Sequence, residues 1–368
     1  LATKFMSTRV NDINNCSSLY GEVFIMRKLL NTLFITTPNI YLSLKGENVV
    51  ITQEEEQLGR FPLHNFEAIC TFGYAGASPK LMHACAERNI NLTFLSRSGK
   101  FLARIVGESK GNVILRKTQY RLSESELESA KIARNFIFAK ISNQKWIVER
   151  MARDYPLRLD VPVFKQVSRD LTATMKEVLQ AEDLERLRGL EGQAATAYFK
   201  LFNQMILQQK ETFVFKNRNR RPPTDHVNAL LSLAYTLLAS DVASALEMVG
   251  LDAYVGYLHR DRPGRASLAL DTMEELRGVM ADRFVLKLIN KKIMQPIDFV
   301  QKENGAVLLT EEGRKKFIKS WQERKQESLT HPYLNEKINW GLVPHTQAIL
   351  LARYLRGDLE EYPPFLWK

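Results

Sequence analysis

The feature that most constrains this chain is a change of hydrophobic pattern at residues 107–112, GESKGN. Before it, from Leu29 to about Val106, short β-rich pieces alternate with Pro, Asn and Gly turn signals at hairpin-like intervals, around one amphipathic helix, SPKLMHACAERNI. After it, apolar residues recur at helical spacing almost to the C-terminus. The pattern predicts an α+β protein of two domains, with a small β-rich domain at residues 26–108 and a larger all-α domain at 114–368.

The charge of the chain bears on its partners. Its 368 residues include 52 Lys and Arg against 41 Asp and Glu, a net charge of +11. Such a surplus favours polyanionic partners such as nucleic acid or anionic lipid, although many basic proteins bind neither. The three cysteines, Cys16, Cys70 and Cys85, cannot all pair within the chain and show no CxxC spacing. This fits a reducing compartment, so we expect a cytoplasmic protein.

Two segments could be mistaken for membrane or targeting elements. The apolar run at 227–251 is long enough to cross a bilayer, but it contains Asn228 and Asp241. We interpret it as a buried helix and expect no membrane partner. Residues 1–25 lack an initiator Met and a cationic segment before a long apolar core, and they precede a plausible start at Met26. We expect them to be a leader or an added upstream segment.

The segment LERLRGLEGQAATAYFKLF places a glutamate on an apolar helical stripe. Its apolar residues recur every three or four positions, and Glu191 falls among them. Because an isolated buried charge is very costly, a carboxylate on such a face must be neutralised, paired or bound to a metal. Glu191 is therefore a candidate metal ligand, and an ion pair with a neighbour such as Arg188 is the alternative.

The segment GYLHRDRPGRASLALDTMEELR combines a histidine with several acids. His259 ends a short apolar piece where a core element meets a loop, a position at which many histidines are only hydrogen bonded. Asp271, Glu274 and Glu275 stand at i, i+3 and i+4, so we expect their side chains to converge on one helical face. Like charges this close need a counter-ion, either a divalent cation or the arginines of an ordinary salt-bridged surface helix. One histidine with several carboxylates suits Mg²⁺ or Mn²⁺ better than structural zinc.

A basic run opens the segment KNRNRRPPTDHVNALLS at residues 216–232. Runs of this kind are usually solvated faces, but this one lies between the Glu191 and His259 segments. It could contact phosphates, and either Thr224 or Asp225 could cap the helix that follows.

Three segments, taken in order, resemble a known family: LRGLEGQAATAYF, RRPPTDHVNALLSLAYTLL and GLDAYVGYLHRDRPGRASLALDTMEELR. Together they resemble the CRISPR-associated spacer-acquisition integrases, the Cas one family, over nearly everything after Met26. Each segment alone is a weak signal, and the resemblance rests on their order and spacing. Two features depart from it, since residues 1–25 have no counterpart and Gly278 stands where the family often has Pro.

The resemblance implies a metal-dependent DNA endonuclease and integrase. By position, its metal ligands would be Glu191, His259 and Glu274. Asp271 would be an accessory acid that orients the ligands or assists a proton. A DNA 3′-OH would attack a phosphodiester at a CRISPR repeat boundary and so insert a short foreign fragment, a spacer, as part of antiviral defence. In this scheme the residues predicted to contact DNA are Arg221, Asn228, Arg265 and Arg277.

The resemblance also implies partners. The β-rich domain would form a homodimer, and the all-α domain would carry catalysis and DNA binding. The partners would be double-stranded DNA, as both fragment and CRISPR leader and repeat, and the small adaptation protein Cas two. A divalent ion can activate the attacking oxygen and stabilise the leaving one, so no protein nucleophile is required.

Two rival interpretations use the same residues. In a non-catalytic DNA-binding scaffold, basic helices hold phosphates and the acids only balance charge. In a general metal-dependent nuclease acting on branched DNA or RNA, water attacks in place of a free 3′ end. Metal-dependent strand joining would separate an integrase from both.

Overall fold

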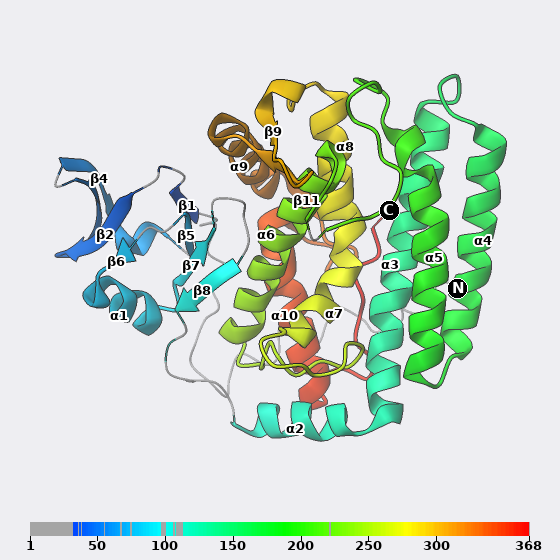
Figure 1. Ribbon diagram of the computed structural model, residues 1–368. Coiled ribbons are helices and arrows are strands. Elements are labelled where there is room, and N and C mark those ends of the chain that lie inside the picture. Colours follow the sequence, from blue (N-terminus) through cyan, green and yellow to red (C-terminus); the bar gives the residue numbers. More distant parts are fainter. Residues whose placement is uncertain are drawn as a thin grey trace.

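The computed structural model describes residues 32–35, 37, 39–54, 56–66, 68–73, 76–96, 101–105, 107, 113–220 and 222–367. The predicted leader at 1–25, most of the predicted linker at 107–112 and Arg221 lie outside the described residues. Within them, a β-rich region comes first and a helical region follows, and the two lie side by side in Figure 1. The predicted order of the two regions is confirmed, while the domain boundaries stay a prediction.

The β-rich region contains two sheets of four strands each. The strands are β1 Thr32–Ile35, β2 Ile40–Lys45, β3 Asn48–Gln53, β4 Glu56–Pro62, β5 Ala68–Phe72, β6 Gly76–Ala77, β7 Asn91–Leu95 and β8 Phe101–Ile105. One sheet has the order β1-β5-β7-β8, in which β5 is parallel to both β1 and β7. The other has the order β4-β3-β2-β6, in which β2, β3 and β4 form an antiparallel meander.

Hairpin-like spacing predicted only part of this pairing. Strands β2 and β3 are joined by a tight turn in which Gly46 takes a left-handed φ of 59°. Strands β5 and β7, in contrast, are parallel, and parallel strands need a crossover connection. The predicted helix supplies it as α1, Pro79–Glu87, which begins where the Ser78 side chain accepts a hydrogen bond from Leu81 N.

The helical region is built around α3, a helix of 29 residues that lies along α4 and α5 in Figure 1. The α-helices are α2 Val113–Glu124, α3 Glu126–Asp154, α4 Val161–Gln180, α5 Leu184–Met205, α6 His226–Met248, α7 Ser267–Leu276, α8 Arg283–Asn290, α9 Glu311–Gln326 and α10 Val343–Arg356. Between α7 and α8 the backbone forms a π-helix, η4, at Arg277–Asp282. Such π segments are frequent at functional sites.

The prediction that residues 114–368 are all-α was wrong. Two antiparallel hairpins interrupt the helices, β9 Phe299–Gln301 with β10 Val307–Leu309, and β11 Ser328–Thr330 with β12 Lys337–Asn339. Their connections contain residues in left-handed conformations, Gly305 with φ 77° and Asn335 with φ 57°. Short 3₁₀ turns also occur: η3 Leu63–Asn65, η5 Pro296–Asp298 and η6 Trp340–Leu342.

Helix α6 covers most of the apolar run at 227–251. Among the described helices it alone has the length and composition to cross a membrane, yet leucines such as Leu230 and Leu238 are fully buried inside the protein. It is a core helix, as predicted. Its far end contacts the β-rich region, where Asn91 of β7 donates a hydrogen bond to Ser244 and Arg104 of β8 pairs with Glu247.

Candidate metal centre

Glu191 of α5 meets a lysine from α3. The apolar stripe of α5 packs into the core through residues such as Leu187 and Ala194, and Glu191 lies at its edge. There Lys140 Nζ donates to Glu191 Oε1. The alternative partner, Arg188, does not pair with Glu191, because its guanidinium donates to the Leu258 carbonyl oxygen and to Glu185.

Glu274 of α7 meets the same lysine. Lys140 Nζ lies 2.6 Å from Glu274 Oε2, and Arg277 Nη2 lies 2.7 Å from Glu274 Oε1. Burial raises the pKa of Glu274, but Arg277 and Lys140 outweigh burial and bring the pKa down to about 2. Glu274 is therefore a buried, ionised carboxylate at neutral pH, placed between two cations.

His259 is held by Asp271. The imidazole Nδ1 lies 2.5 Å from Asp271 Oδ1, while Asp271 Oδ2 accepts hydrogen bonds from the backbone of Tyr257 and Leu258. With Nδ1 engaged by a carboxylate, Nε2 is the nitrogen left to bind a metal, as in many carboxylate–histidine–metal arrangements. Gly256 makes room for this contact, since a Cβ there would lie 2.7 Å from Asp271 Oδ2.

The expected convergence of three acids on one face of α7 was wrong. Asp271 faces the His259 loop, Glu274 faces Lys140, and Glu275 faces the C-terminal segment. There Glu275 accepts hydrogen bonds from the Tyr362 hydroxyl and from Phe365 N at 2.8 Å. Burial raises the pKa of Glu275 to about 7, although these bonds oppose the rise. Adjacent buried carboxylates repel one another, so each lies against separate donors or cations.

Several arginines lie near the site, and Arg277 pairs directly with Glu274. The guanidinium carbons of Arg277 and Arg218 lie 4.8 and 5.1 Å from the Tyr235 ring centroid, so both stack on that ring. Burial lowers the pKa of Arg265, and the nearby Arg262 lowers it further. The lowered pKa of Arg218 likewise follows mainly from burial. This concentration of positive charge suits a phosphate ligand.

Asn228, predicted to contact DNA, has a different role in the structure. Its side chain is fully buried, and Asn228 Nδ2 donates to Asn217 O and Asp225 Oδ2. Its Oδ1 accepts from Arg218 Nη1 at 2.6 Å. These bonds shape the loop before α6, and Asp225 rather than Thr224 caps that helix. The structure therefore does not support a direct DNA contact by Asn228.

The side chains fit a divalent cation in kind, although the ligand set stays a prediction. In the part of the chain that the structure describes, no three His, Cys, Asp or Glu side chains lie close enough together to hold an ion. Glu191 and Glu274 nevertheless share one ammonium, and His259 is among the groups near Glu274 that lower the pKa of this carboxyl. The buried Glu274 Oε2 also accepts no well-directed hydrogen bond from the described residues.

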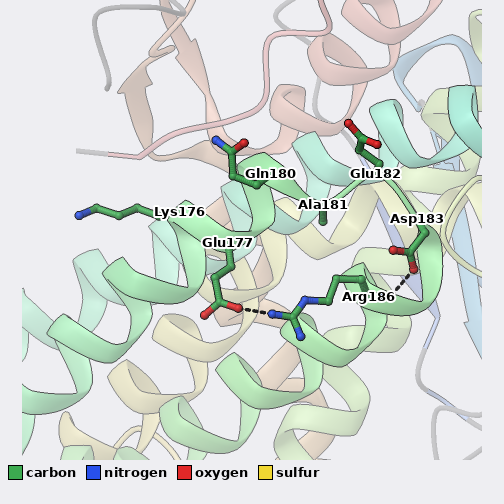
Figure 2. Close-up of a pocket in the computed structure, with 7 residues that line it drawn as sticks. All are labelled: Lys176, Glu177, Gln180, Ala181, Glu182, Asp183 and Arg186. Carbon is green, nitrogen blue, oxygen red and sulfur yellow. Dashed lines mark hydrogen bonds and ion pairs between the residues drawn. The ribbon is translucent and has the colours of Figure 1, made fainter.

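A shallow hollow elsewhere on the helices is not part of this site. Figure 2 shows it at the turn between α4 and α5, where Glu177 pairs with Arg186 and Asp183 caps α5. Its lining residues are Lys176, Glu177, Gln180, Ala181, Glu182, Asp183 and Arg186. None of the predicted site residues is among them.

Sequence reasoning missed two residues of the site, Lys140 and Tyr235, and it placed Arg218 only within a basic run that could contact phosphates. A signal for Lys140 exists, because it stands on the buried face of NFIFAKISNQKW together with Phe136 and Ile137. A lysine at such a position requires a buried anion. Nothing local marks Tyr235, since its arginine partners come from other elements.

In this helical region carboxylates and a histidine lie among arginines, an arrangement that suits enzymes acting on phosphodiesters. The fold and the site therefore define this class of protein. A family model described as CRISPR associated protein Cas1 matches residues 33–323. A CRISPR-associated endonuclease Cas1 from Rhodospirillum rubrum is 47% identical over 349 residues, covering 93% of this chain and 100% of that protein. Another from Chlorobaculum tepidum is 45% identical over 343 residues, with the same two coverages. The chain belongs to the Cas1 family of CRISPR-associated endonucleases. The predicted family is confirmed, and with it the activity of a CRISPR-associated endonuclease.

Solved structures of low sequence identity show the same fold. A casposase bound to integration product has a TM-score of 0.79 at 23% identity, covering 92% of this chain and 95% of that chain. A CAS1 protein from Thermotoga maritima has a TM-score of 0.76 at 22% identity, covering 89% and 97%. A chain of a Cas6-RT-Cas1–Cas2 complex has a TM-score of 0.78 at 22% identity, covering 93% of this chain and 36% of that chain.

Proposed function

We propose that this protein joins DNA 3′ ends to a CRISPR array with Mg²⁺ or Mn²⁺ held by Glu191, His259 and Glu274. The observation that carries the proposal is the meeting of Glu191 and Glu274, from separate helices, at one cation. Carboxylates and imidazole are suitable ligands for these metals. A bound ion of this kind activates the attacking oxygen and stabilises charge on the leaving oxygen.

In the proposed reaction the 3′-OH of a DNA fragment attacks a phosphodiester at the repeat boundary. A bond forms between this oxygen and phosphorus, the bond from phosphorus to the original 3′ oxygen breaks, and the proton lost by one oxygen is balanced by the proton gained by the other. Asp271 keeps the His259 ring oriented throughout, because it binds Nδ1. Arg277 and Arg265 supply positive charge for the phosphate.

The proposed partners are double-stranded DNA, as fragment and as CRISPR leader and repeat, a second copy of this chain bound through the β-rich region, and Cas2. The net charge of +11 supports double-stranded DNA as a partner. One structural neighbour was solved with an integration product and another in a Cas1–Cas2 complex, which supports DNA and Cas2 as partners. We also propose a cytoplasmic location, supported by the low cysteine content and the unpaired, buried thiols of Cys70 and Cys85.

A strand-joining assay tests the proposal. A labelled duplex with 3′-OH ends and a supercoiled plasmid carrying a CRISPR leader and repeat are incubated with the protein, with and without Cas2, in Mg²⁺, Mn²⁺ or EDTA. We expect label in the plasmid only with metal, and none with His259→Ala. Arg356→Ala is the matched control, since this exposed arginine pairs with Asp358 near the C-terminus. DNA binding without joining would support the scaffold, and cleavage without joining would support the nuclease.

A further inference from the structure

We propose that the Lys140 ammonium is a resident cation of the candidate metal centre. A divalent ion must displace this ammonium from between Glu191 and Glu274 in order to bind. The inference rests on the proposed function, because it takes these two carboxylates as metal ligands. Lys140 is then a positioning residue that gathers the ligands before the metal arrives and limits how tightly the metal binds.

The burial of Lys140 carries the first step. Its side chain is only 3% exposed and stands on a helix face shared with fully buried Phe136 and Ile137. Taking an ammonium out of water is very costly unless anions compensate for the lost hydration. The compensating anions are Glu191 and Glu274, with side chains 29% and 5% exposed. The lysine and the two carboxylates therefore form one electrostatic unit.

The identity of the contacted oxygens carries the second step. Lys140 Nζ contacts Glu191 Oε1 and Glu274 Oε2, and Arg277 holds the other oxygen of Glu274. If Glu191 and Glu274 hold a divalent ion, that ion would compete with the Lys140 ammonium for these same carboxylates. The long, flexible stem of a lysine allows its ammonium to move away, whereas the two glutamates stay anchored on α5 and α7.

Three variants of the full-length chain test the inference by Mn²⁺ titration, followed by electron paramagnetic resonance of free Mn²⁺. Lys140→Met removes the competing charge and keeps the stem, so we expect its Mn²⁺ dissociation constant to fall about tenfold or more. Lys140→Arg keeps the charge, so its constant should stay within about threefold of the wild type. The matched control is Lys145→Met, a lysine of the same helix that pairs with Glu149 outside the site. Unchanged or weaker Mn²⁺ binding by folded Lys140→Met overturns the inference.

A second measurement uses the wild type, in case Lys140→Met does not fold. Acetylation of Lys140 by an amine-reactive reagent, followed by mass spectrometry, should be slow without metal and faster with saturating Mn²⁺, while acetylation of Lys145 stays constant. An equal rate for Lys140 in both conditions contradicts displacement. Glu191→Gln separates the two proposals. If it binds Mn²⁺ as the wild type does, the proposed metal centre fails; if it loses Mn²⁺ while Lys140→Met remains unchanged, only the displacement by metal fails.

Discussion

His259 Nδ1 lies 2.5 Å from Asp271 Oδ1, and the same carboxylate accepts backbone hydrogen bonds from Tyr257, Leu258 and His259. One fully buried side chain thus builds the loop and orients the imidazole that the loop carries. This double role of Asp271 explains why an acid that is not predicted to touch the metal stands one helical turn before Glu274.

We expect Asp271→Asn to weaken metal binding more than it weakens the fold. The amide keeps one oxygen acceptor for the loop, but it no longer supplies a carboxylate to Nδ1 of His259. Loss of such a partner lowers metal affinity or activity by about 10- to 100-fold. Mn²⁺ titration and strand joining measure the effect. Asp252→Asn is the control, because Asp252 caps a different turn by accepting from Tyr254 N. Wild-type Mn²⁺ affinity in Asp271→Asn would show that the pairing does not matter.

Local patterns predicted the elements better than their pairing. The apolar spacing of α5 placed Glu191 on a core-facing stripe because the helical period is a property of the segment itself. The parallel pairing of β1 with β5 depends on residues that are not neighbours in sequence. The hairpins β9–β10 and β11–β12 have strands of three residues, too short to show an alternation.

The types of side chain in the site could be predicted, but their environments could not. Glu274 and Glu275 are adjacent and chemically alike, yet Arg277 and Lys140 keep the first ionised whereas burial raises the pKa of the second to about 7. The difference comes from Lys140 on α3 and from Tyr362 near the C-terminus, which no local pattern connects to α7.

Asn143 joins helix α7 to the C-terminal segment, so its loss should destabilise both. Its Nδ2 donates to the carbonyl oxygens of Glu275 and Phe365, and its Oδ1 accepts from Trp367 N. Asn143→Ala leaves these buried groups unpaired, and we expect the free energy of unfolding to fall by about 2–5 kcal/mol. Urea denaturation measures it. Asn304→Ala, at an exposed turn, should change it by less than about 1 kcal/mol. Equal effects would contradict this role for Asn143.

Asp282 should make stability depend on pH in weak acid. Burial raises the pKa of Asp282 to about 6, although the hydrogen bond from the Tyr235 hydroxyl opposes the rise. The folded chain then binds this proton more tightly than the unfolded chain. The proton on Asp282 therefore adds about 3 kcal/mol to the free energy of unfolding. This contribution is fully present below about pH 4 and is lost as the pH rises through about 6.

Asp282→Asn removes this proton equilibrium while keeping an oxygen acceptor for Tyr235. Urea unfolding of both proteins between pH 4 and 7.5 gives the difference in free energy of unfolding, which should change in favour of the variant as the pH rises. Asp358→Asn, an exposed partner of Arg356, serves as the control and should run parallel to the wild type. A wild-type curve parallel to that of Asp282→Asn would show that Asp282 titrates normally.

Arg265 should contact DNA through phosphate alone. Like charge from Arg262 and Arg220 adds to burial in lowering its pKa, and a bound phosphate would relieve that repulsion. We expect Arg265→Ala to weaken binding of every DNA sequence alike and to reduce the slope of log affinity against log salt by about 1. Fluorescence anisotropy with two unrelated duplexes at several salt concentrations measures both effects, with Arg356→Ala as control. A loss confined to one duplex would instead indicate that Arg265 reads bases. The same measurement on Arg221→Ala tests the predicted DNA contact of Arg221, which lies outside the described residues.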